Sequence, residues 1–146
     1  MYKQIIIARK DLNMSPGKLA AQVSHGSMAF LSMAVRRAAN QASSQKYSCL
    51  VELDKDLYEQ WMLGAFTKCV LQAKNKNQLM KSVTIAEELG MKEGEDFFLI
   101  KDNCYTELEP EEIGEDGIGR TLTCIGFKPM DSEVIDQIGK KYHLWT

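Results

Sequence analysis

A short apolar run followed by a long helical segment constrains the fold of this chain more than any other feature. From Gln4 to Ala8 the chain is almost entirely apolar, which is typical of a strand buried on both faces of a sheet. A helix is predicted from about Pro16 to Ala39, because Ser15 is a favourable N-cap and proline fits the first helical position. Small side chains along one side of this helix allow it to approach a sheet closely. The chain therefore begins with a strand–loop–helix unit.

Strands and helices continue to alternate along the rest of the chain. Three further strands are predicted, at Lys68–Ala73, Asp96–Ile100 and Thr121–Phe127. Caps and stop signals predict three more helices: from Asp54 or Asp56 to Gly64, from Asn77 to Gly90, and from Asp131 to Gly139. Asn40–Ser48 is predicted to be a loop, and Cys49–Leu53 fits either a short strand or an apolar loop. This order indicates an α/β fold with helices on both faces of the sheet.

The length and composition match one ordinary domain spanning residues 1–146. No apolar run approaches the roughly 20 residues needed to span a bilayer, and the start of the chain lacks the pattern of a signal peptide. The cysteines have neither a C-x-x-C pair nor a histidine at ligand spacing; they are Cys49, Cys69, Cys104 and Cys124. We therefore expect a cytoplasmic protein with free thiols and no metal site.

Charge is distributed unevenly along the chain. Residues 1–86 contain 12 Lys and Arg against 5 Asp and Glu, a net charge of +7. Residues 87–146 contain 6 against 15, a net charge of −9, and the two parts sum to −2. Such asymmetry is a hint that the basic part meets a polyanion. The overall pI of about 5.7 argues against a binder of duplex DNA, which would be basic throughout.

Lys18 lies in the first turn of the predicted helix, where a cation is unfavourable by a few tenths of a kcal/mol to about 1 kcal/mol. A residue that breaks a local rule often belongs to a functional site. The open amides of a helix start after a strand also favour an anion. Lys18 therefore marks either a site for a phosphate, a carboxylate or a developing oxyanion, or a solvated lysine that tolerates the penalty.

Three hydrogen-bonding side chains follow one another along one face of this helix. Lys18, Gln22 and His25 are spaced i, i+4 and i+7, and Ala29 continues the line. Because histidine exchanges protons near neutral pH, His25 is either a proton shuttle or a structural histidine bonded to nearby backbone. The neighbouring line is expected to pack in the core; it consists of Leu19, Val23, Gly26 and Phe30.

Polar residues follow two of the predicted strands, at the sheet edge where α/β proteins bind ligands. They are Arg9, Lys10 and Asp11 after the first strand, and Lys101 and Asp102 after the third. Lys18 and Asp102 are therefore expected to face each other across one crevice. Asp102 would orient Lys18 or act as a general base towards water, and Thr106 would hold a water or a hydroxyl. The alternatives are ordinary turn chemistry at Asp102 and a Cys104 nucleophile paired with His25.

The chain resembles the peptidyl-tRNA hydrolases of the second type, the class of archaea and eukaryotes. The resemblance rests on Lys3–Met14 and Gly17–His25, which match the opening block of that family in residue type and spacing. Later matches are the D-x-x-x-T of Asp102 and Thr106, Ile125-Gly126, and Ile135–Gly139 with Leu144. They follow in order along the whole chain.

The resemblance implies a three-layer sandwich in which helices flank a mixed four-stranded sheet on both faces, often in a homodimer. It implies hydrolysis of the ester between a peptide and tRNA without a metal or organic cofactor. Lys18, Asp102 and Thr106 match the important lysine, aspartate and threonine of the family, and Gln22 and His25 extend the polar face. The residues expected to contact the tRNA substrate are Lys3, Arg9, Lys10, Asp11, Gln22, Arg36 and Arg37. Thr106, Gln22 and His25 would arrange the water and the ribose.

Two segments depart from the pattern of the family. Asn103-Cys104-Tyr105 replaces the usual A-G-R between the aspartate and the threonine, and Glu109–Gly119 is longer and strongly acidic. These departures keep two alternatives open. One is a catalytically inactive relative that binds tRNA, a nucleotide or a protein partner, and the other is a small-ester or amide hydrolase that uses Cys104.

Overall fold

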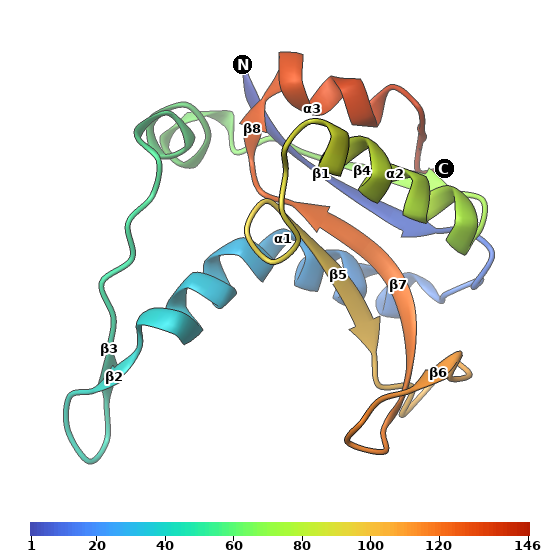
Figure 1. Cartoon of the computed structure of the whole chain (residues 1–146), viewed down its shortest axis with the longest axis horizontal. Helices are drawn as coiled ribbons and strands as arrows, with labels where there is room; N and C mark the ends of the chain where they lie inside the picture. The colour runs from blue at the N-terminus through green and yellow to red at the C-terminus, as the bar shows by residue number, and fades with distance from the viewer.

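Four long strands form the centre of the protein, which is described over residues 1–146 in a computed structural model (Figure 1). They are β1 (Tyr2–Arg9), β4 (Lys68–Ala73), β5 (Phe97–Asp102) and β7 (Gly119–Phe127), in the order β5-β7-β1-β4. The pair β1 and β4 is parallel, whereas β7 is antiparallel to both β1 and β5. The mixed sheet that the resemblance implied is therefore present.

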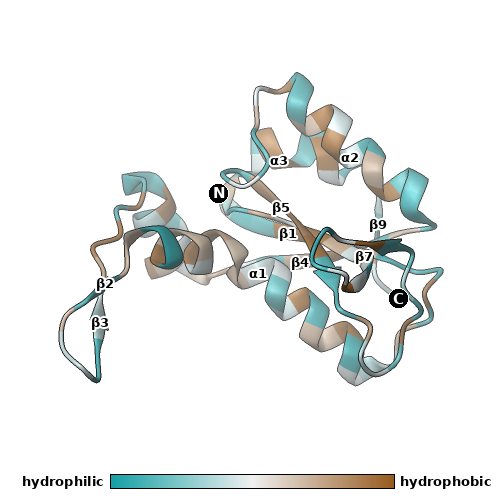
Figure 2. Ribbon diagram, turned by 60° about the horizontal axis from the view of Figure 1, so that its bottom comes forward, coloured by the Kyte–Doolittle hydropathy of each residue, from teal (hydrophilic) through white to brown (hydrophobic).

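Helices cover both faces of this sheet. Helix α1 (Pro16–Ala38) packs on one face, and α2 (Lys76–Glu88) and α3 (Ser132–Gly139) pack on the other (Figure 1). Figure 2 shows apolar strands lying between these two helical layers. The predicted α/β class with helices on both faces is confirmed. No helix combines the length and the apolar character needed to cross a membrane.

The sheet has seven strands, more than the four expected. Three short strands extend it: β6 (Glu112–Ile113) beside β7, β8 (Met130–Asp131) beside β1, and β9 (His143–Leu144) beside β4. Two-residue strands carry too little sequence pattern to be predicted. The expected loop at Asn40–Ser48 also contains a small hairpin of β2 (Asn40–Gln41) and β3 (Tyr47–Ser48), which projects away from the sheet (Figure 1).

Several helix caps match the sequence signals and others do not. The side chains of Ser15 and Asp131 cap α1 and α3 as predicted. Helix α2 begins earlier than expected, because Asn75 rather than Asn77 accepts the hydrogen bond from the N–H of Gln78. The segment Leu57–Ala65 (η1) is a π-helix with a kink at Gly64, where the backbone is not helical and where the helix was predicted to end. It is preceded by Asp56, whose side chain makes no capping hydrogen bond. Cys49–Leu53 has no regular structure.

The buried side of α1 differs from the predicted one. Its buried residues are Gln22, Gly26 and Ala29, whereas Leu19 and Val23 are only half-buried. The reason is that α1 crosses β7 where both elements have a glycine, Gly26 in the helix and Gly126 in the strand. A Cβ built on Gly126 would lie 2.0 Å from the carbonyl oxygen of Gly26, and one on Gly26 would lie 2.9 Å from Ile6 Cγ2. Helix and strand therefore touch backbone to backbone.

We predict that Gly126→Ala lowers the free energy of unfolding by about 3 kcal/mol or more, because the added methyl group meets main chain that cannot rotate away. The measurement is urea denaturation followed by circular dichroism. Gly17→Ala is the matched control, since a Cβ there meets nothing within 4 Å. That control should be neutral or stabilising by up to about 1 kcal/mol. Equal stability of Gly126→Ala and the native protein would contradict the close crossing.

Candidate active site

The first turn of α1 and the end of β5 bring a lysine and an aspartate together. Lys18 Nζ donates to Asp102 Oδ1 at 2.8 Å, and the two side chains are only 14% and 13% exposed. Thr106 Oγ1 lies 3.4 Å from the same Nζ. Asp102 is the last residue of β5 rather than the first residue after it. The expected juxtaposition of Lys18 with Asp102 is therefore present, with Thr106 beside it.

A buried polar relay holds the aspartate from the sheet side. Thr123 Oγ1 donates to Gln22 Oε1 at 2.7 Å, and Gln22 Nε2 donates to Asp102 Oδ1 at 3.2 Å. Gln22 is 2% exposed and Thr123 is fully buried. The backbone N–H of Cys104 donates to the other carboxylate oxygen of Asp102 at 2.9 Å. Because each buried polar group has a partner, the relay fixes the carboxylate without an unsatisfied donor or acceptor.

The start of α1 already holds an anion that belongs to the chain itself. Glu107 accepts hydrogen bonds from the N–H of Ser15 at 2.8 Å and from Ser15 Oγ at 2.6 Å. These bonds hold the pKa of Glu107 below its usual value. The carboxylate thus occupies the position at which a helix N-terminus favours an anion. It also ties the segment that carries Thr106 to the helix that carries Lys18.

Arg9 lies inside the protein rather than on a surface that faces a ligand. It is 4% exposed, and all five of its N–H groups have acceptors, supplied by Asp11, Glu111 and the carbonyl of Leu122. These hydrogen bonds, with that to Asp11 first, raise the pKa of Arg9 despite burial. The expected contact of Arg9 with substrate does not fit this burial, whereas the Asp11 side chain is 34% exposed and its contact with substrate stays a prediction. Arg9 instead ties β1 to the acidic segment before β6.

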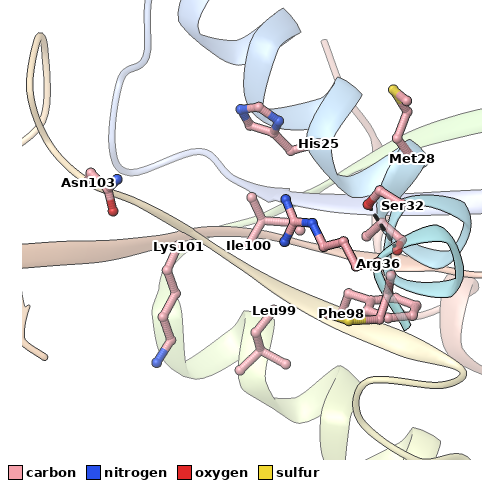
Figure 3. Close-up of a pocket in the computed structure, with 11 residues that line it drawn as sticks. His25, Met28, Ser32, Arg36, Phe98, Leu99, Ile100, Lys101 and Asn103 are labelled. Carbon is pink, nitrogen blue, oxygen red and sulfur yellow. Dashed lines mark hydrogen bonds between the residues drawn. The ribbon is translucent and has the colours of Figure 1, made fainter. Parts of the chain in front are cut away.

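The other predicted substrate-contacting residues lie in different places. Lys3 is near the opposite end of β1 and pairs with Asp136 of α3 at 2.6 Å, so it is remote from the site at the end of that strand. Lys10 is exposed and lies 4.4 Å from the ring centre of Trp145. His25 and Arg36 line a groove between α1 and β5 (Figure 3), and His25 makes no hydrogen bond to Lys18 or Asp102.

The sequence patterns did not predict several residues that lie at or near the carboxyl ends of β1, β4 and β5. Thr123 and Glu107 hold the site through contacts that no local pattern reveals. Lys74 and Lys76 follow β4 as Lys10 follows the parallel strand β1. Lys74 and Lys76 have no acidic partner within 4 Å, whereas Lys10 Nζ donates to the main-chain oxygen of Thr146 at 2.5 Å. The rule that ligands bind beyond strand ends would have found the two lysines if it had been applied to β4.

The cysteines show no arrangement typical of a cysteine hydrolase. Cys104 Sγ contacts the carbonyl of Asp102 at 3.4 Å and Thr121 Oγ1 at 3.5 Å, and it makes no hydrogen bond to His25. Burial raises the pKa of Cys124 to about 12, so that thiol stays protonated. No group of three or more His, Cys, Asp or Glu side chains is placed to hold a metal ion.

Comparisons with known proteins agree with this geometry. The family model "Peptidyl-tRNA hydrolase PTH2" matches residues 2–145. A peptidyl-tRNA hydrolase of Methanopyrus kandleri is 36% identical over 139 residues, which is 94% of this chain and 93% of that protein. One of Thermoplasma acidophilum is 30% identical over 145 residues, or 99% of each chain. The chain belongs to the peptidyl-tRNA hydrolase family PTH2. It is therefore a hydrolase.

Membership in this family gives the altered segment after Asp102 a specific reading. The resemblance described above implies a glycine at the position of Cys104. The φ of Cys104 is +60°, a conformation that glycine adopts without strain. In this hydrolase the backbone at residue 104 therefore has the conformation typical of glycine, although the residue is a cysteine. The N–H that this conformation presents is the one that binds Asp102.

We predict that Cys104→Gly raises the free energy of unfolding by up to about 1 kcal/mol, because relief of about 1–2 kcal/mol of left-handed strain exceeds the entropy cost of glycine. Hydrolase activity should be retained, since the N–H to Asp102 remains. The measurements are urea denaturation and turnover of an N-blocked aminoacyl ester of tRNA. A stable but inactive Cys104→Gly protein would instead identify Cys104 as the nucleophile.

Proposed function

We propose that this protein hydrolyses the ester that joins a peptide to the terminal ribose of tRNA, with Lys18 and Asp102 as its catalytic residues. The observation that carries the proposal is the ion pair of Lys18 and Asp102, largely shielded from solvent and oriented by Gln22. The names of the family and of its members supply the substrate class.

Lys18 is suited to stabilise the charge that develops on the ester carbonyl. An ammonium group has three N–H donors, and Asp102 and Thr106 take up two of them. The third is free to bind the carbonyl oxygen as it becomes an oxyanion. A positioned donor of this kind lowers the barrier by about 2.7–4 kcal/mol.

Asp102 is suited to direct the attacking water. Its Oδ1 accepts from Lys18 and Gln22, whereas Oδ2 accepts only from the N–H of Cys104, so Oδ2 retains a lone pair for a water. The water oxygen bonds to the acyl carbon while its proton passes to Asp102. The ester C–O bond then breaks, and the ribose oxygen takes up the proton. Thr106 holds the water or the ribose hydroxyl in this scheme.

The tRNA body is best received by the lysines at the strand ends. Lys10, Lys74 and Lys76 lie after two neighbouring parallel strands. Lys74 and Lys76 have no acidic partner within 4 Å, whereas Lys10 Nζ donates to the main-chain oxygen of Thr146 at 2.5 Å. Lysines that contact phosphates give affinity without reading sequence, which suits an enzyme that must accept many tRNAs. The acidic segment around Glu111 and Glu112 is held by ion pairs with Arg9 of β1 and Lys101 of β5.

We predict that the protein releases tRNA from N-acetyl-aminoacyl-tRNA faster than from unblocked aminoacyl-tRNA. Lys18→Met and Asp102→Asn should each lower kcat/KM by at least about 100-fold, because each removes a positioned catalytic group. The measurement is single-substrate kinetics by acid-gel separation of charged and free tRNA. Lys46→Met, in the turn of the hairpin away from the sheet, is the matched control and should behave as the native protein.

A folded native protein without turnover would contradict the proposal. The remaining function would then be binding without catalysis, which the salt dependence of tRNA affinity tests. Affinity for tRNA that falls steeply with salt would identify phosphate contacts. Absent or salt-independent binding would leave a protein or an uncharged ligand as the partner.

A further inference from the structure

A groove runs between α1 and β5, beginning beside the active site. It has a volume of about 630 Å³, and its walls include His25, Met28, Met33 and Arg36 from α1 and Phe98–Lys101 from β5. Figure 3 shows the Arg36 side chain reaching across it towards Ile100, with His25 on the wall above. Asn103, which also lines the groove, directly follows Asp102. The groove therefore reaches the residues on either side of Asp102 in the sequence, Lys101 and Asn103.

One wall of this groove is an unpaired strand edge. Strand β5 is the last strand of the sheet on its side and pairs only with β7. Along an antiparallel pair, the backbone groups of successive residues alternately bond to the partner strand and face away from it. The carbonyl of Asp96 accepts a hydrogen bond from the N–H of Lys128, on the β7 side. Three residues later, the N–H and the carbonyl of Leu99 therefore face away from β7. The outward carbonyl of Phe97 accepts from the N–H of Gly94, whereas Leu99 has no backbone hydrogen bond outside the ladder. Leu99 thus offers one donor and one acceptor to an added strand.

The other walls suit a peptide better than RNA. Met28 and Met33 are flexible apolar side chains that adapt to varied partners, and Phe98 is only 6% exposed, so no aromatic face is open for a base to stack on. Lys101 is neutralised by Glu112 at 2.7 Å. Arg36 has no acidic partner within 4 Å, and its N–H donors suit peptide carbonyls.

We infer that this groove binds the peptide part of the substrate as an extra strand along the free edge of β5. The inference rests on the proposed function, because it takes the ester to lie at Lys18 and Asp102. The C-terminal carbonyl of the peptide then lies at the end of β5, and the peptide runs parallel to that strand. Leu99 lies three residues before Asp102, so at about 3.3 Å per residue the fourth residue from the ester lies opposite Leu99. Peptides of four residues therefore gain contacts that a single residue does not make.

The first test is a series of N-acetyl-peptidyl-tRNAs with one to four alanine residues. We expect kcat/KM to rise about tenfold between one and four residues, which corresponds to about 1.4 kcal/mol of added binding. Met33→Glu and Arg36→Ala should each remove most of this rise, so that the ratio between long and short substrates falls towards one. Circular dichroism melts verify that both variants fold. A kcat/KM that does not depend on peptide length would overturn the inference.

The second test separates this inference from the proposed function. The ¹⁵N-labelled protein is titrated with N-acetyl-tetra-alanine, which has the chemistry of the product, and with a CCA trinucleotide. The peptide should shift the amide resonance of Leu99 and slow its hydrogen exchange. Peptide binding at Leu99 in a protein that hydrolyses nothing would support the groove and reject the proposed function. Shifts caused by the trinucleotide alone, or by neither ligand, would overturn the peptide assignment.

Discussion

The contact between the backbones of α1 and β7 at Gly26 and Gly126 determines where the rest of the site lies. The space between helix and strand is too small for a Cβ on Gly126, so the helix lies nearer to the sheet than side-chain packing would allow. Gln22, one turn earlier, then reaches Thr123 on the same strand. Lys18, one further turn earlier, reaches Asp102 on the neighbouring strand. A helix held farther away would break both contacts.

This close approach also explains why polar side chains are tolerated in the interior. The buried cluster beneath α1 is small, consisting of Ile6, Ala8 and Cys124, whereas the larger core lies beneath α2 and α3. Gln22 and Thr123 are buried between α1 and the sheet, where the apolar cluster is small. They are hydrogen-bonded to each other, and Gln22 is also hydrogen-bonded to Asp102. Such a fully bonded network specifies one geometry. The larger core on the opposite face supplies most of the apolar burial, which leaves the α1 face free to carry the site.

Local sequence signals predicted the parts of this structure that local physics determines. The apolar runs predicted the four long strands, and Ser15 and Asp131 cap their helices as expected. The rule that ligands bind beyond strand ends predicted that Lys18 and Asp102 face each other. The features that were predicted wrongly depend on residues far away in the sequence. Arg9 is internal because Glu111, which is 102 residues away, meets it. Gln22 is buried because Gly26 lies against Gly126, and no periodicity within the helix reveals that contact.

The central claim is that Lys18 and Asp102 act as one unit in a site fixed by the crossing of α1 and β7. A double-mutant cycle with Lys18→Met, Asp102→Asn and the combined variant tests this claim most directly, with kcat/KM for N-acetyl-aminoacyl-tRNA as the readout. Residues that act as a unit are strongly non-additive. The combined variant should therefore lie within about threefold of the less active single variant. Losses that multiply, to about 10⁴-fold or more for two independent groups each contributing about 100-fold, would contradict the claim.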